Sequence, residues 1–132
     1  MKILTGLLLI TAMFFLMTCK KDNGNSNTTL TGKWKMSEGL ADPGDGSGTW
    51  QPVSKEAGQL YVQFDANGKL EGTAFPNDVS YVVKDSVTLT FTSKDKVIQN
   101  YRYNINNGTL TMSPAGSIMC YEGCGTRYIK MK

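Results

Sequence analysis

Apolar and polar side chains alternate over short segments from residue 30 onward. The clearest case is residues 86–93, SVTLTFTS, in which Val87, Leu89 and Phe91 alternate with hydroxyl side chains. Strict alternation over about four to eight residues is the period of a strand with one buried face. No segment after residue 30 carries a helical repeat of adequate length, so the pattern predicts an all-β domain over residues 30–132.

Eight strands are predicted, at residues 31–38, 59–64, 69–75, 79–84, 87–92, 97–105, 109–113 and 125–131. The links between most of them are short and rich in Asp, Asn, Gly and Ser, which is typical of tight turns. Successive hairpins place consecutive strands side by side. Eight antiparallel strands in this order close most simply into an up-and-down β-barrel, which leaves no exposed edge.

The alternation also assigns an inward face to each predicted strand. The inward set is Trp34, Met36, Leu60, Val62, Phe64, Leu70, Gly72, Ala74, Tyr81, Val83, Val87, Leu89, Phe91, Tyr101, Tyr103, Ile105, Leu110, Met112, Arg127, Ile129 and Met131. A buried arginine needs a partner, because an unpaired buried charge is costly. We expect Arg127 to lie across the indole of Trp34 and close the end of the barrel. The alternative is an ordinary core tryptophan with Arg127 extended to water.

A glycine two residues before a tryptophan on the first strand, Gly32 and Trp34, combined with an inward arginine on the last, Arg127, resembles the lipocalin and wider calycin signature. Residues 103–112 and the closing strand at 126–131 are similar to the C-terminal half of bacterial lipocalin-like lipoproteins. The resemblance implies an eight-stranded barrel with a small hydrophobic ligand inside. We expect its lining to be Met36, Trp50, Phe64, Tyr81, Phe91, Tyr101, Tyr103 and Met112.

The link at residues 39–58 is long and rich in Gly and Pro, which predicts irregular structure, yet it contains Trp50. Two interpretations are open: the link folds over the barrel mouth with Trp50 against the ligand, or Trp50 pins it to the outer wall. Asp42, Asp45 and Ser47 suggest a calcium site, but their spacing matches no calcium loop, and Gly-Asp-Gly is ordinary turn chemistry.

The N-terminal segment has the pattern of a bacterial lipoprotein signal. Lys2 precedes an apolar run of secretory length at residues 3–17, and residues 16–19, Leu-Met-Thr-Cys, resemble a lipobox. We therefore expect a signal peptide at residues 1–18, fatty acids such as palmitate on Cys19, and a flexible tether at residues 19–29. The expected location is the outer membrane of a Gram-negative bacterium, facing either the periplasm or the cell surface. The alternative is a plain secretory signal with an incidental cysteine.

Chemistry-bearing clusters are scarce in this sequence. The absence of histidine excludes Ser-His-Asp and Cys-His machinery, and most carboxylates fall in predicted turns, so we expect no enzyme activity, metal or cofactor. The net charge of +3 shows no basic stripe, which argues against nucleic acid as a partner. Cys120 and Cys124 are expected to form a disulfide in an oxidising compartment; reduced thiols, or metal or redox chemistry, are the alternatives.

The sequence thus predicts a membrane-anchored lipocalin-like binding protein that holds a small hydrophobic ligand in its barrel. The alternative is a filled barrel that presents loops to a protein or glycan partner at the cell surface, as an accessory subunit or inhibitor. The two differ in whether the interior has free space, since an eight-stranded barrel can enclose a ligand or be filled by its own side chains.

Overall fold

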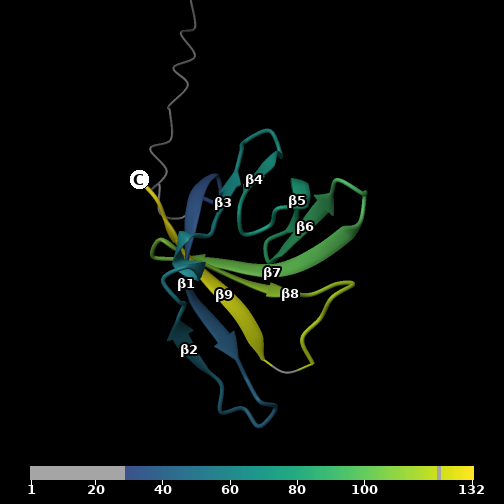
Figure 1. Ribbon diagram of the computed structural model, residues 1–132. Coiled ribbons are helices and arrows are strands. Elements are labelled where there is room, and N and C mark those ends of the chain that lie inside the picture. Colours follow the sequence, from purple (N-terminus) through teal and green to yellow (C-terminus); the bar gives the residue numbers. More distant parts are fainter. Residues whose placement is uncertain (1–28, 122) are drawn as a thin grey trace, which may run out of the picture.

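The computed structural model describes residues 29–121 and 123–132, and these form a nearly closed, eight-stranded antiparallel barrel with one additional short strand outside the ring (Figure 1). The elements are β1 (Gly32–Ala41), β2 (Thr49–Pro52), the 3-10 turn η1 (Ala57–Gln59), β3 (Tyr61–Phe64), β4 (Leu70–Gly72), β5 (Asp78–Asp85), β6 (Thr88–Ser93), β7 (Ile98–Asn106), β8 (Thr109–Pro114) and β9 (Cys124–Lys130). The all-β, up-and-down barrel predicted from the sequence is confirmed.

The expected signal peptide, the acylation of Cys19 and the tether up to residue 28 lie outside the described residues. Within the part of the chain that is described, no helix is long and apolar enough to cross a membrane.

The first and last strands of the ring, β1 and β9, lie side by side, as the closed order of hairpins predicted. The order of the ring is β4-β3-β1-β9-β8-β7-β6-β5, with Met36 of β1 opposite Tyr128 of β9. The two ends of this series meet at a seam between β4 and β5. There Lys69 and Ser80 form a single bridge, and the Tyr81 N–H donates to the Gly68 carbonyl at 2.8 Å. The seam therefore has far fewer ladder hydrogen bonds than any other position in the ring.

Large side chains fill the inside of this ring. Trp34, Val62, Phe64, Leu89, Phe91 and Leu110 are completely buried. Burying each such side chain contributes roughly 1.5 to 3 kcal/mol, so this cluster is the main stabilising element of the domain. The indole N–H of Trp34 donates to the carbonyl of Leu30 at 2.7 Å, which satisfies its one polar group.

Five of the side chains predicted to point inward do not. Val83 and Val87 are 49% and 54% exposed, because they lie at the β5–β6 hairpin, where a register irregularity between Val83 and Asp85 takes the strand ends out of the core. On β9 the predicted phase is wrong: the inward residue is Tyr128, at 2% exposure. The remaining three therefore lie on the outer face, namely Arg127, Ile129 and Met131.

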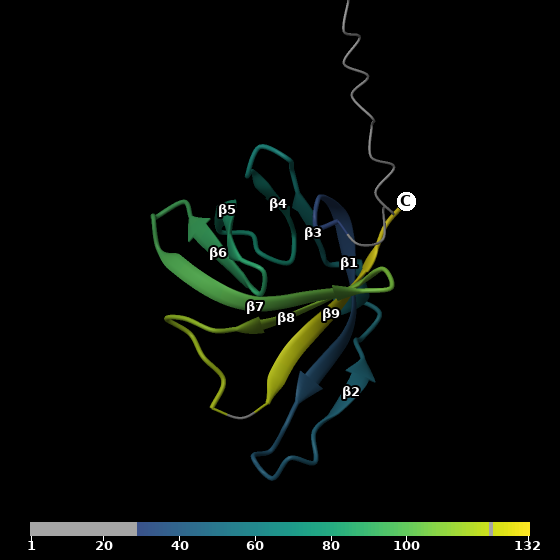
Figure 2. The ribbon, with the colours of Figure 1, turned by 180° about the vertical axis from the view of Figure 1, so that it is seen from behind.

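The long link predicted to be irregular instead contains β2, which pairs with the second half of β1. A β-bulge at Ser37 bends β1, and its hydroxyl donates to the carbonyl of Arg127 at 3.1 Å. Beyond the bulge, β2, residues 38–41 of β1 and residues 124–127 of β9 form a three-stranded extension, which we call the flange. Figure 2 shows the flange projecting from the end of the barrel opposite the C-terminus.

Candidate functional site

The barrel interior, where a ligand was expected, is occupied by side chains that pack on one another. Of the predicted lining residues, Phe64, Tyr81, Phe91 and Met112 are buried. The ring of Phe64 lies 4.9 Å from that of Tyr81, edge to face, and the ring of Phe91 lies 4.7 Å from that of Tyr101. Such distances are optimal for aromatic pairs. These residues thus come together as a packed core.

The remaining predicted lining residues on the barrel strands lie at the margin of this core. Met36, Tyr101 and Tyr103 are half-buried and pack against it. Burial raises the pKa of the Tyr101 hydroxyl to about 12 and also raises that of Tyr128 far above its usual value. Both tyrosines therefore pack their rings in or against the core, and their hydroxyl groups are neutral at physiological pH.

The predicted contact between Trp34 and Arg127 is wrong. Trp34 faces Lys130 in the register of β1 and β9, and the Lys130 ammonium lies 5.0 Å from the centre of its ring. The same ammonium donates to the carbonyl of Thr29 at 2.7 Å, and partial burial lowers its pKa. A cation does lie beside the buried indole, but it is Lys130, which lies on the opposite face of β9 from Arg127. Gly32 and Trp34 thus keep a structural position without Arg127.

Arg127 instead lies on the outer face of the flange, stacked on Trp50 of β2. Its guanidinium carbon is 3.9 Å from the centre of the indole ring, and its Nη1 donates to Oε2 of Glu38 at 3.0 Å. Gly125 makes room for this arrangement, since a Cβ there would lie 2.9 Å from the ring. Trp50 thus lies against the outer wall, as the second of the two interpretations proposed. It does not cover the barrel mouth.

Two open hollows lie on the outer face of the barrel, and the first of them includes Glu38 and Arg127. One, of about 480 Å³, lies between β1, β7, β8 and β9; the other, of about 420 Å³, lies over β6, β7 and β8. They share Asn104 and Thr111, and we refer to them together as the outer trough. Its lining consists of Glu38, Val87, Thr88, Arg102, Tyr103, Asn104, Asn106, Asn107, Thr109, Thr111, Ser113 and Arg127.

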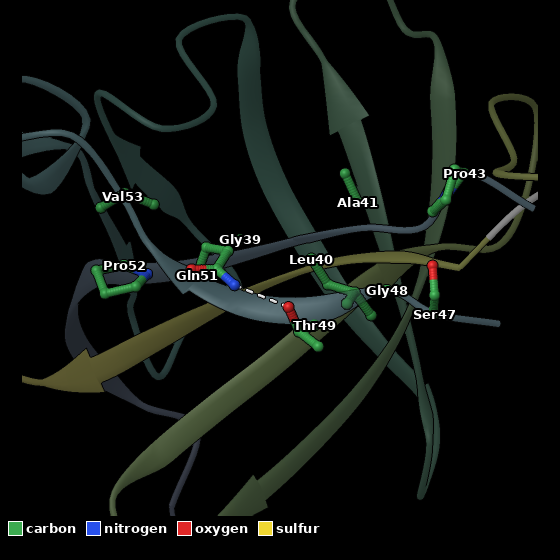
Figure 3. Close-up of a pocket in the computed structure, with 10 residues that line it drawn as sticks. All are labelled: Gly39, Leu40, Ala41, Pro43, Ser47, Gly48, Thr49, Gln51, Pro52 and Val53. Atoms are coloured by element: carbon green, nitrogen blue, oxygen red, sulfur yellow. Dashed lines mark hydrogen bonds between the residues drawn. The ribbon is translucent and has the colours of Figure 1, made fainter.

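The flange carries a third hollow on its β1–β2 hairpin, about 420 Å³ in volume (Figure 3). Gly39 forms part of its floor, and Gln51 donates to the Thr49 hydroxyl at 2.7 Å. Its other lining residues are Leu40, Ala41, Pro43, Ser47, Gly48, Pro52 and Val53. This lining offers apolar side chains and the polar groups of Ser47, Thr49 and Gln51, but no charged group.

The acidic turn at the tip of the flange is built by its own backbone. The Asp42 carboxylate accepts hydrogen bonds from the N–H groups of Gly44, Gly46 and Gly48 at 2.8 to 3.1 Å, and these bonds, chiefly that of Gly44, lower its pKa. Asp45 accepts likewise from the Ser47 N–H. No group of three or more potential metal ligands from Cys, Asp and Glu occurs among residues 29–121 and 123–132.

Cys120 and Cys124 are joined in a disulfide, with their Cα atoms 6.0 Å apart. The ring they close lies beside the acidic turn, where the Asp42 N–H donates to the Gly123 carbonyl at 2.9 Å. The disulfide thus ties the β8–β9 link to the start of β9, which pairs with the end of β1 at Ala41.

Comparison of the chain with protein-family models, with curated proteins and with solved structures finds no match. The candidate site therefore depends on geometry alone. Sequence reasoning missed Glu38, Asn104 and Thr111, because polar residues on an outer strand face carry no pattern that separates a ligand contact from a solvated surface. The informative sign was Asn in three of the four positions 104–107, at the end of one strand.

Proposed function

We propose that this protein is an envelope-anchored binding scaffold, in which a filled barrel holds the flange and the outer trough in position for a partner outside the barrel. The observation that carries the proposal is the contrast between the two surfaces. Trp34, Phe64 and Phe91 are 0% exposed and belong to one core cluster, whereas the outer trough is open. This favours the scaffold alternative over a small hydrophobic ligand in the interior.

The geometry around Arg127 supports an exterior binding role. Its side chain is one-third exposed, and both Trp50 and Glu38 restrain it. An arginine has five N–H donors, of which Glu38 takes one, so donors remain for a ligand. A side chain that is already ordered loses little entropy on binding.

Lipid attachment through Cys19 is part of this proposal, with the lipobox-like segment at residues 16–19 as its support. β1 begins at Gly32, close in the sequence to the expected tether, and it ends in the flange at Ala41, so the flange lies at the far end of β1 from the first described residues. Such a tether raises the local concentration of a domain near any partner in the same envelope. Membership of the lipocalin-like group remains a proposal based on Gly32 and Trp34.

Site-specific photo-crosslinking in bacteria tests the function directly. A photo-reactive residue in place of Asn107, on the outer trough, is expected to capture a partner when Cys19 is intact. The matched control replaces Asn77, which lies in the link at the β4–β5 seam, on the far side of the ring from β8 and β9. Equal products from both positions, or none from either, would overturn the proposal.

The interior alternative is tested on the purified chain. Fatty acids, retinoids and haem-like compounds are titrated while tryptophan fluorescence is recorded. We expect no saturable change, because the barrel core is packed. A saturable quenching of Trp34, retained in a Trp50→Phe variant, would instead establish an interior ligand.

A further inference from the structure

The outer trough has the chemistry of a carbohydrate site, and we propose that its ligand is an acidic oligosaccharide. This inference depends on the proposed function, whose binding face it shares. It adds the class of ligand and the side chains that select it. Three features carry the inference: the pairing of the strands beneath the trough, its polar groups without partners, and the position of its one free cation.

The first feature is a row of side chains that crosses four neighbouring strands. Asn104 of β7 is opposite Thr111 of β8, which is opposite Arg127 of β9, which is opposite Glu38 of β1. Neighbouring strands lie about 4.8 Å apart, so the row is about 14 Å long. It thus forms a polar strip whose length suits several linked sugar rings.

A second row runs parallel to the first, two residues along each strand. It contains Thr88 of β6, Arg102 of β7 and Ser113 of β8, and it ends at Gly125 of β9, where a Cβ would lie 2.9 Å from the indole of Trp50. The two rows are about 7 Å apart, from the rise of about 3.4 Å per residue. Together they make a surface wide enough for contacts on both sides of a sugar chain.

The second feature is the free hydrogen-bonding capacity of this surface. The side chains of Asn104, Asn106, Asn107, Thr109 and Thr111 make no hydrogen bond with any other residue of the described chain. Amides and hydroxyls both donate and accept, which matches the hydroxyl groups of a sugar. The lining has only two largely apolar members, Val87 and Tyr103, whereas the buried centre of a protein interface is rich in apolar side chains. A polyhydroxylated ligand therefore fits better than a protein.

The third feature is Arg102, which sets the expected charge of the ligand. Arg127 is neutralised by Glu38, but Arg102 is exposed and has no carboxylate partner among the described residues. A carboxylate does lie further along this row: Asp85 of β5 is opposite Thr88 of β6. It accepts a hydrogen bond from the Val87 N–H at 2.9 Å and forms no ion pair with Arg102. An arginine binds carboxylate or sulfate groups through paired, charge-assisted hydrogen bonds. A sugar with such a group is therefore preferred over a neutral one.

Isothermal titration calorimetry on the purified chain tests the inference. The ligands are hexasaccharides of galacturonic, mannuronic and glucuronic acid, and each is compared with the neutral hexasaccharide of galactose, mannose or glucose. We expect at least one acidic hexasaccharide to bind at least about tenfold more tightly than its neutral counterpart, the loss typical of one charge-assisted hydrogen bond. Arg102→Gln is expected to remove this preference, because it lowers the affinity for the acidic hexasaccharide about tenfold more than that for the neutral one. Lys55→Gln, an exposed cation on the link before η1, is the matched control and should change neither affinity.

A second pair of variants tests the position of the ligand. Asn104→Ala/Thr111→Ala is expected to lower both affinities about tenfold or more, since it removes two hydrogen-bonding side chains. Asn77→Ala/Thr92→Ala makes the same chemical changes outside the trough and should retain wild-type affinity. Thermal denaturation verifies that all variants remain folded.

The inference is overturned if no acidic hexasaccharide binds at millimolar concentration, or if binding survives the trough substitutions. The crosslinking experiment separates this failure from failure of the proposed function. A protein captured from Asn107 would exclude the oligosaccharide and retain the scaffold function. Equal crosslinking from Asn107 and Asn77, or none from either, would contradict both the scaffold function and the oligosaccharide ligand.

Discussion

Truncation of Phe91 gives the sharpest test of whether the barrel interior is packed. Phe91 is completely buried on β6, and its ring centre lies 4.7 Å from that of Tyr101, 5.1 Å from that of Phe75 and 6.0 Å from that of Phe64. Replacing it with alanine removes a ring that three others contact. The surrounding strands are joined by ladders on both sides, so they cannot close the gap fully.

The expected loss is large relative to the total stability. Phe→Ala substitutions in packed cores cost about 3 to 5 kcal/mol. A domain of about 100 residues has about 5 to 15 kcal/mol in total, so Phe91→Ala should remove about a fifth of it or more. At about 4 to 8 °C per kcal/mol, the melting temperature should fall by about 12 °C or more.

Urea denaturation followed by circular dichroism measures the effect. Ile98→Ala, on the neighbouring strand at 55% exposure, serves as the control and should change stability by no more than about 0.5 kcal/mol. An apolar cavity of this kind also binds small apolar molecules, so Phe91→Ala should gain affinity for benzene that the wild type lacks. A loss below about 1 kcal/mol for Phe91→Ala would refute the reasoning, because it would mean that the interior already contains free space.

Three further predictions concern the flange and the core tyrosines. Gly125→Ala places a Cβ 2.9 Å from the indole of the flange and should cost about 1 to 3 kcal/mol in thermal denaturation, whereas Gly39→Ala, with nothing within 4 Å, should be near neutral. Burial raises the pKa values of Tyr101, to about 12, and of Tyr128, so above about pH 10 the unfolded chain loses protons that the folded chain retains. Stability, measured as the denaturant midpoint, should therefore fall from about pH 10 to about pH 12, and Tyr101→Phe should make this fall smaller. Replacing Cys120 and Cys124 with serine should lower stability by about 2 kcal/mol, because the ring is small, and leave the far-ultraviolet spectrum unchanged; loss of the barrel signal would contradict a role confined to the flange.

The strand positions and the closure of the ring were predictable because they follow from local alternation. Leu89 and Phe91 between threonines identify β6 and its buried face without further information. The tight turns then leave few alternatives for the order of strands. These features depend on short-range physics, which a single sequence contains.

The phase of β9 was not predictable in this way. Ile129 and Met131 suggested one inward face, and Tyr128 with Lys130 occupy the other. The choice depends on volume, since the core has space for a tyrosine ring opposite Met36. Such complementarity between distant residues leaves no period in the sequence.

The flange was missed for a related reason. A single bulge at Ser37 reverses the faces of β1 beyond it, so Glu38 and Leu40 lie on the same outer surface as Arg127 and Trp50. A one-residue shift exchanges every inward and outward position that follows. The contact between Arg127 and Trp50 could therefore not be derived from alternation.

The central claim, that binding occurs on the outer face and not in the barrel, has one most direct test. The chain has two tryptophans, Trp34 inside the barrel and Trp50 beside Arg127 on the flange, and their indole N–H signals in a nitrogen-15 NMR spectrum report on each place separately. During titration with the acidic hexasaccharides and with fatty acids, the account predicts that the Trp50 signal moves with an acidic hexasaccharide and that the Trp34 signal moves with neither. A saturable shift of Trp34 with a fatty acid, with Trp50 unchanged throughout, would contradict it.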